Sequence, residues 1–155
     1  MTTLATIGYE GATVASFLDA LRAAGIGLLV DVRALASSRR PGFAKTRLAA
    51  NLAEAGIDYL HLRGLGTPAD GRAAARAGRH DEMRRVFAGH LATPAAQAEL
   101  DVLAELVAGE RRVCILCFEA DPRHCHRSLV AAALAERMPL VVEHLHPGVE
   151  EEGDG

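Results

Sequence analysis

The chain has 155 residues, half of them hydrophobic and 24% charged, which is typical of one soluble globular domain and excludes a disordered, collagen-like or coiled-coil chain. Its formal net charge of −3 argues against a wholly basic nucleic-acid coat protein but leaves room for a local basic patch. Aromatic residues make up only 4% of the chain, so we expect a core of aliphatic side chains.

Strand and helix patterns alternate through the first part of the chain. Short apolar runs predict strands, and apolar residues three or four positions apart predict the helices between them. In chain order we expect a strand at Leu4–Gly8, a helix capped by Thr13, a strand at Ile26–Val32, a helix capped by Thr46 and a strand at Ile57–Leu62.

The second part begins with the least regular segment, Arg63–His80, which holds several glycines and a helical turn or two at Ala73–Ala77. We interpret this segment either as a mobile lid or as a plain surface excursion. The patterns that follow predict a helix from Asp81, a helix opened by Thr93-Pro94, a strand at Arg112–Phe118, a helix at Ser128–Arg137 and a strand at Leu140–Leu145.

This alternation predicts an α/β fold: a single domain over residues 1–147 with a mainly parallel sheet of about five strands and helices on both faces. Residues 148–155 are acidic and rich in glycine, so we expect a disordered tail there.

Cysteine usage and hydropathy bear on location. The N-terminus has no basic segment before its apolar residues, and no apolar run is long enough to span a membrane. The three cysteines, Cys114, Cys117 and Cys125, are not a disulfide framework. We therefore expect a cytoplasmic protein with reduced thiols and no membrane partner.

Ligands of open α/β sheets bind beyond the carboxyl ends of the strands, so the residues after each predicted strand are the candidate site. Gly8, Tyr9 and Glu10 follow the first strand. A glycine before a helix allows a ligand to approach the backbone closely, although a tight strand-to-helix turn explains it equally well.

The segment after the second predicted strand is strongly basic. It holds Arg33, Ser38 and Arg39 among further arginines and a lysine, with no acidic residue between Arg33 and Arg47. Guanidinium groups and hydroxyls suit a phosphate or carboxylate, so we predict an anion site here; a solvated basic loop is the alternative.

The densest cluster follows the fourth predicted strand. Cys125, His126 and Arg127 stand just before a helix, where the helix dipole and the arginine favour a thiolate. We predict Arg127 as an anion ligand, Cys125 as a nucleophile or redox thiol, and His126 or Glu119 as the proton carrier. A small buried packing residue is the alternative for Cys125.

A metal centre is a second interpretation of the same cluster. Cys117, Cys125 and His126 are ligand types that suit zinc, with Glu119 as a base, although their spacing is not that of a common zinc finger. We assign no metal ligand on this pattern and keep zinc as the alternative.

Several motifs occur in an order that resembles a known family. They are Thr6-Ile7-Gly8-Tyr9, Leu29-Val30-Asp31-Val32-Arg33, Ser38-Arg39 with Phe43, Gly56-Ile57-Asp58-Tyr59 with Leu65-Gly66, and Leu116-Cys117-Phe118-Glu119 with Cys125-His126-Arg127. Together they resemble the bacterial and archaeal family of domain of unknown function 488, over residues 4 to 135. The resemblance implies a compact α/β domain. The family's common first motif has His-Ser where this chain has Tyr9-Glu10, so either Tyr9 or Glu10 serves any catalytic step of that histidine, or the step is lost.

These observations favour an enzyme that acts on an anionic, phosphate-bearing ligand, either a small molecule or a nucleic-acid phosphate. The catalytic candidates are Cys125, His126, Glu119, Glu10 and Tyr9, and the anion-binding candidates are Arg33, Ser38, Arg39, Arg127 and Gly8. The alternatives are a non-catalytic nucleic-acid-binding or regulatory module and a metal-dependent hydrolase.

Overall fold

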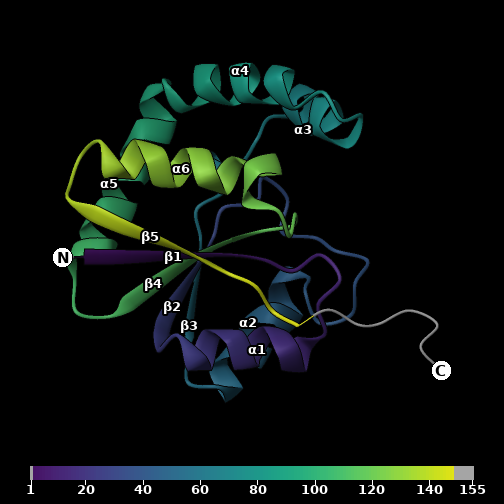
Figure 1. The fold of residues 1–155 in the computed structure, drawn as a ribbon, viewed down its shortest axis with the longest axis vertical. Helices are drawn as coiled ribbons and strands as arrows, with labels where there is room; N and C mark the ends of the chain where they lie inside the picture. The colour runs from purple at the N-terminus through teal and green to yellow at the C-terminus, as the bar shows by residue number, and fades with distance from the viewer. Residues whose placement is uncertain (1, 149–155) are drawn as a thin grey trace.

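A computed structural model, which describes residues 2–148, shows five strands in one all-parallel sheet of order β3-β2-β4-β1-β5 (Figure 1). The α/β prediction is therefore confirmed. The elements are β1 (Thr2–Gly8), α1 (Val14–Ala23), β2 (Ile26–Asp31), α2 (Lys45–Glu54), β3 (Asp58–His61), α3 (Ala69–Arg76), α4 (His80–Leu91), α5 (Pro94–Ala108), β4 (Arg112–Cys117), α6 (His126–Ala135) and β5 (Leu140–Leu145), with short 3-10 helices at Arg63–Leu65 and Pro122–His124.

Helices cover both faces of the sheet. The helices α1 and α2 lie on one face and α3 to α6 on the other (Figure 1). Successive side chains of a strand point to opposite faces, so Ile115 packs with the four-helix layer while Leu116 packs with α1 and α2. The central strand β4 is buried from Val113 to Cys117, as expected for a parallel strand covered on both sides.

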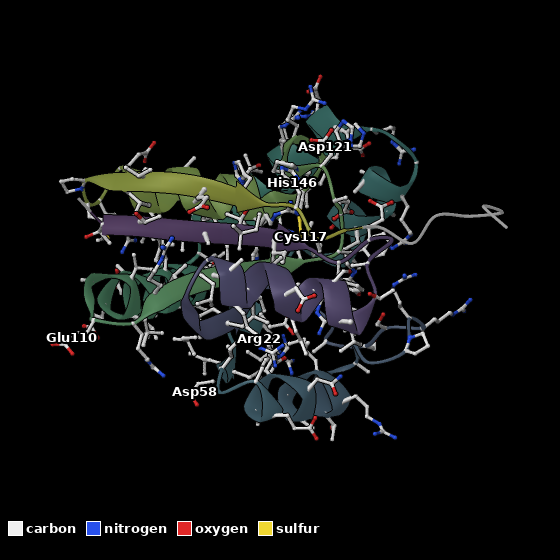
Figure 2. All side chains as sticks on the ribbon, turned by 60° about the horizontal axis from the view of Figure 1, so that its bottom comes forward. Arg22, Asp58, Glu110, Cys117, Asp121 and His146 are labelled. Atoms are coloured by element: carbon white, nitrogen blue, oxygen red, sulfur yellow. A yellow bond between two sulfur atoms is a disulfide. The ribbon has the colours of Figure 1, made fainter. Side chains whose placement is uncertain are left out.

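The topology has a switch point between β1 and β4. The chain leaves β1 through α1 toward β2 and leaves β4 through α6 toward β5, so the two crossovers run in opposite directions and pass over opposite faces of the sheet. Such a switch point leaves a crevice at the carboxyl ends of the two neighbouring strands. Figure 2 shows Cys117, Asp121 and His146 at this end of the sheet and Asp58 and Glu110 at the other end.

The helix boundaries confirm some predictions and correct others. The Thr13 side chain caps α1, with its Oγ1 accepting from the Ser16 N–H at 3.0 Å. Thr46 does not cap α2, because that helix begins at Lys45 after Ala44 and has no side-chain cap. The helix α6 begins two residues earlier than expected, which makes Cys125 its N-cap.

The segment expected to be irregular is more helical than its glycine content suggested, since α3 occupies eight residues of it. Of the expected tail, Gly148 accepts a hydrogen bond from Ser16 Oγ at 2.7 Å, and residues 149–155 lie outside the described part of the chain. Among the described residues, no helix has the length and apolar character needed to cross a membrane.

Candidate functional site

A cavity of about 420 Å³ lies at the carboxyl ends of β1, β2 and β4, beside α3. Its lining comes from the segments that follow these three strands, from α3 and from the start of α6. The lining residues are Tyr9, Glu10, Arg33, Ala34, Leu35, Ser37, Thr67, Arg72, Ala75, Arg76, Met83, Cys117, Phe118, Glu119, His124 and His126. Four of the five predicted catalytic residues line it: Tyr9, Glu10, Glu119 and His126.

The wall after β2 is a closed network of charges. The Arg33 guanidinium donates to both carboxylate oxygens of Asp31 at 2.9 and 2.7 Å, and also to the Tyr9 hydroxyl and the Phe43 carbonyl. The Tyr59 hydroxyl donates to Asp31 at 2.6 Å. Burial alone lowers the pKa of Arg33, but the hydrogen bonds and charge of Asp31 outweigh it and raise that pKa. The anion that Arg33 binds in this structure is therefore the Asp31 carboxylate, whereas the sequence suggested a bound ligand.

The residues after β1 are held by the loop that follows β4. Glu10 accepts a hydrogen bond from the Ala120 N–H at 3.0 Å, and its own N–H donates to the Phe118 carbonyl at 2.9 Å. A Cβ on Gly8 would overlap the carbonyl oxygen of Glu119. The glycine thus permits a close approach between two segments of the chain. Tyr9 is buried, with its ring stacked on Phe43 at a centroid distance of 4.7 Å.

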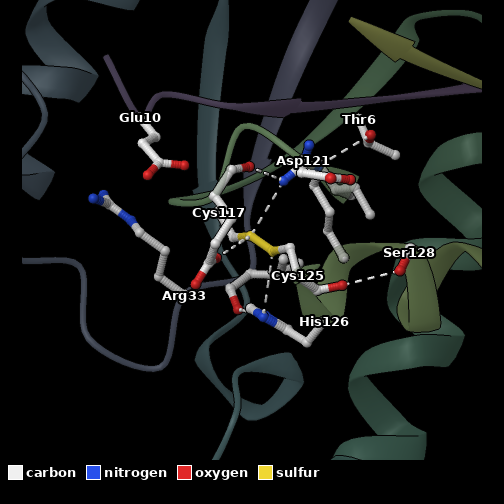
Figure 3. The surroundings of a disulfide bond; sticks show 12 residues. Thr6, Glu10, Arg33, Cys117, Asp121, Cys125, His126 and Ser128 are labelled. Atoms are coloured by element: carbon white, nitrogen blue, oxygen red, sulfur yellow. Dashed lines mark hydrogen bonds between the residues drawn. A yellow bond between two sulfur atoms is a disulfide. The ribbon is translucent and has the colours of Figure 1, made fainter. Parts of the chain in front are cut away.

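The wall formed by β4 and α6 carries the sulfur and imidazole groups (Figure 3). Cys117 ends β4 and Cys125 precedes α6, and the structure joins their sulfur atoms as a disulfide. The prediction of reduced thiols is therefore wrong for these two residues. Cys114 is the free cysteine, buried within β4. A strand end and a helix start eight residues apart meet at the switch point, which the spacing alone did not show.

His126 and Glu119 are the ionisable groups on this wall. Burial lowers the pKa of His126 to about 4, so its imidazole is neutral at physiological pH. Burial also raises the pKa of Glu119, whose Oε2 lies 3.7 Å from the Cys117 sulfur. The wall therefore combines a neutral base with a carboxyl that gives up its proton less readily than usual.

Arg127 lies behind the cavity and is fully buried. Its guanidinium donates to Thr6 Oγ1 at 3.2 Å, to the Glu119 carbonyl and to the Ala120 carbonyl, and it reaches the Cys117 sulfur at 3.6 Å. Burial lowers the pKa of this guanidinium. Its donors fix the loop after β4 from within the protein, and the residue is not part of the cavity lining.

Four further predicted residues also lie off the cavity lining: Gly8, Ser38, Arg39 and Cys125. The Ser38 hydroxyl accepts from the Arg40 N–H at 3.1 Å, and Arg39 is exposed. Cys125 lies behind Cys117, so the sulfur that faces the cavity belongs to Cys117.

Two cationic residues that line the cavity beside Arg33 were not predicted from the sequence: Arg72 and Arg76 of α3. Arg72 donates to the Thr67 carbonyl at 2.8 Å, and Arg76 is exposed. The spacing of four residues puts both on one face of a helix, which was a usable signal. It was lost because this segment was expected to contain little helix.

A family model describes the same region. The model for the domain of unknown function DUF488 matches residues 13–134. The chain belongs to the DUF488 family. The DUF488 match includes the disulfide, the Asp31–Arg33 pair and α3, whereas Tyr9 and Glu10 precede it. A search of the curated proteins finds no match.

Proposed function

We propose that this DUF488 protein is an enzyme that acts on a phosphate-bearing ligand bound in the cavity. One observation carries the proposal: a single cavity joins two arginines of α3 with a wall of sulfur, imidazole and carboxyl groups. Cavities that combine an apolar surface with a few convergent polar groups and perturbed pKa values are typical of active sites.

The anion-binding half of the proposed site consists of Arg72 and Arg76, and Ser37 lines the same cavity. Guanidinium groups bind phosphate oxygens in pairs of hydrogen bonds. The Thr67 carbonyl holds Arg72 at the edge of the cavity, which orients its remaining donors. These two arginines take the role that the sequence suggested for Arg33 and Arg127.

The organic part of the ligand would contact the apolar lining. Phe118 is 46% exposed and Leu35 is 60% exposed, and both line the cavity. Apolar side chains of this size at a cavity wall suit a flat or hydrophobic group attached to the phosphate. A nucleotide or a nucleic-acid end has this combination of groups.

The reacting half of the proposed site contains Cys117, His126 and Glu119. Hydrolase and transferase chemistry needs groups that hold and release protons beside the scissile bond. His126 is neutral and Glu119 has a raised pKa, so both suit that role.

Isothermal titration calorimetry with AMP and with inorganic phosphate tests the anion half. We expect the double variant Arg72→Ala, Arg76→Ala to bind AMP at least about tenfold more weakly, the effect of losing about 1.4 kcal/mol of charged hydrogen bonding. The matched control is Arg39→Ala, Arg47→Ala, which removes the same charge from exposed residues outside the lining and should keep the affinity. No binding by the wild type, or equal loss in both double variants, would refute the assignment of this cavity.

A second candidate function is a non-catalytic nucleic-acid-binding module. The observation in its favour is that three cationic side chains are exposed close together in the chain: Arg39 on the segment after β2, and Lys45 and Arg47 at the start of α2. It predicts that the affinity for a DNA or RNA duplex falls steeply with added salt. In that case Arg39→Ala, Arg47→Ala would weaken duplex binding, and Arg72→Ala, Arg76→Ala would leave it unchanged.

A further inference from the structure

Three ligand-type atoms converge on the wall of the cavity: the sulfurs of Cys117 and Cys125 and the Nδ1 of His126. One ligand atom from each of the three residues lies within 4.8 Å of those of the other two, and all three residues are buried (Figure 3). We propose that in the reduced chain these residues form a binding site for a zinc-class divalent ion. The assignment deepens the proposed function by naming the reacting centre, and it rests on that function only for its catalytic meaning. With the ion bound, His126 is a ligand, and Glu119 alone keeps the proton-carrying role.

The hydrogen bond of the His126 ring fixes which nitrogen is free. His126 Nε2 lies 2.7 Å from the Val32 carbonyl oxygen, which can only accept, so Nε2 carries the proton. The Nδ1 of the neutral ring then presents its lone pair, and it lies 3.8 Å from the Cys125 sulfur. Histidine ligands of metals commonly donate their second N–H to a carbonyl in this way, whereas a plain disulfide needs no such partner.

The backbone separation of the two cysteines also suits a shared ion. Their Cα atoms are 7.2 Å apart, beyond the usual range of about 4.4–6.8 Å for disulfides. Two thiolates on one tetrahedral zinc lie about 3.8 Å apart, given Zn–S distances of about 2.3 Å. The ion therefore fits a backbone spacing that is wide for a direct bond, with small side-chain rotations to bring the ligands around it.

The balance of charges at the site also favours a divalent ion. Two thiolates and one divalent ion together carry no net charge, so the buried site avoids an unpaired charge. The buried Arg127 guanidinium, 3.6 Å from the Cys117 sulfur, favours the thiolate form of that ligand. Soft sulfur ligands with one imidazole are a donor set that selects zinc over calcium or magnesium.

The site would keep an open coordination position toward the cavity. Cys117 and His126 both line the cavity, and Cys125 completes the set from behind. Three protein ligands and one open position are characteristic of catalytic zinc sites. Glu119 lies on the same wall with its carboxyl 3.7 Å from the Cys117 sulfur, which places a proton acceptor next to that position.

The disulfide and the metal site are two states of one cysteine pair. Reduction by a small dithiol breaks the S–S bond, adds two electrons and two protons to the pair, and leaves the dithiol as its own disulfide. Binding of the ion then releases the two thiol protons to solvent. Oxidation of the pair removes two of the three ligands, so the oxidised chain should not bind the ion.

Zinc titration of the reduced full-length chain against a chromophoric chelator tests the proposal. We expect one Zn²⁺ per chain, and we expect Cys117→Ser, Cys125→Ser and His126→Ala each to weaken binding by more than the about 10–100-fold that outer-shell changes cost. Cys114→Ala is the matched control, because this buried cysteine is outside the cluster, and it should bind as the wild type does. Circular dichroism verifies that each variant is folded.

A second measurement uses the wild type alone and so does not depend on variants that fold. In the reduced chain, N-ethylmaleimide should modify Cys117, which lines the cavity, and one equivalent of Zn²⁺ should protect it in a mass spectrum. Absence of bound zinc, an unprotected Cys117, or equal binding by the oxidised chain would overturn the assignment. AMP binding, measured separately through Arg72 and Arg76, distinguishes this failure from a failure of the proposed function.

Discussion

The two walls of the cavity that follow β2 and β4 both carry ionisable groups, but those groups differ in what they contact. Beside β2, Arg33 and Asp31 are bonded to each other and to two tyrosine hydroxyls. Beside β4, the Nδ1 of His126 lies 3.8 Å from the Cys125 sulfur, and Glu119 lines the cavity. The first wall directs its charges at partners within the fold, and the second carries the groups that we propose to act on a ligand.

The comparison shows why a count of charged residues at strand ends is an incomplete guide to a binding site. Arg33 and Arg127 stand at the right end of the sheet, yet their donors are directed at internal acceptors. Arg72 and Arg76 come from a helix and face the cavity. The partners of a guanidinium, rather than its position in the sequence, separate a structural arginine from a binding one.

The largest expected effect belongs to the β2 wall. Replacing Asp31 with Asn leaves the buried Arg33 charge without its partner, which should lower the free energy of unfolding by about 3–5 kcal/mol. Tyr59→Phe removes only one hydrogen bond to the same carboxylate and should cost about 0.5–1.5 kcal/mol. Urea unfolding measures both. Similar small losses for the two variants would show that the ion pair is not the main support of this wall.

The contact between the end of β1 and the β4 wall gives the next effect. Gly8→Ala places a methyl group against the Glu119 carbonyl and should lower the free energy of unfolding by about 1–3 kcal/mol. Gly89→Ala is the control, because nothing lies within 4 Å of its added Cβ and it sits inside α4, where alanine is the better helix former. Thermal melting of the two variants should therefore shift in opposite directions, and a neutral Gly8→Ala would contradict the close approach.

Unlike Arg33, the α3 arginines should contribute to ligand affinity and little to the free energy of unfolding. Because Arg76 is exposed and has no part in the buried network, Arg76→Ala should change the free energy of unfolding by no more than about 0.5 kcal/mol. Calorimetry should nevertheless show that the Arg76→Ala variant binds AMP more weakly than the wild type does. A large loss of stability with unchanged AMP affinity would make Arg76 a structural residue.

The smallest expected effect concerns Cys114, whose thiol should not be alkylated while the chain is folded. Burial raises the pKa of this thiol well above its ordinary value, so the reactive thiolate is scarce at pH 8–9 in the folded chain. Mass spectrometry after iodoacetamide treatment of the reduced protein should find Cys114 unmodified until urea is added. Modification of Cys114 under native conditions would show that the sheet opens near β4.

Much of the fold was accessible from the sequence because its signals are local. Apolar runs such as Ile26–Val32 need two covered faces, and the glycines after α1 and α2 have positive φ, which marks the ends of these helices. The start of α6 was placed late because Pro122 and Asp121 suggested a longer break, whereas those residues form a short 3-10 turn.

The site was only partly accessible because its geometry is non-local. The strand-end argument brought Tyr9, Glu10, Glu119 and His126 to one cavity, as the structure shows. It did not reveal that Cys117 and Cys125 meet, or that Arg33 is satisfied by Asp31, since both depend on side-chain direction after folding. Arg72 was missed because small residues and glycines hid a helix that tertiary packing stabilises.

The position of Arg127 has a consequence for the thermodynamics of binding. Its guanidinium ties Thr6 of β1 to the backbone carbonyls of Glu119 and Ala120, so the loop that carries Glu119 is ordered before any ligand arrives. A preorganised loop loses little conformational entropy when it is occupied. The affinity of a ligand at this wall should therefore reflect its direct contacts, while the entropic cost of binding falls on the flexible side chains of Arg72 and Arg76 across the cavity.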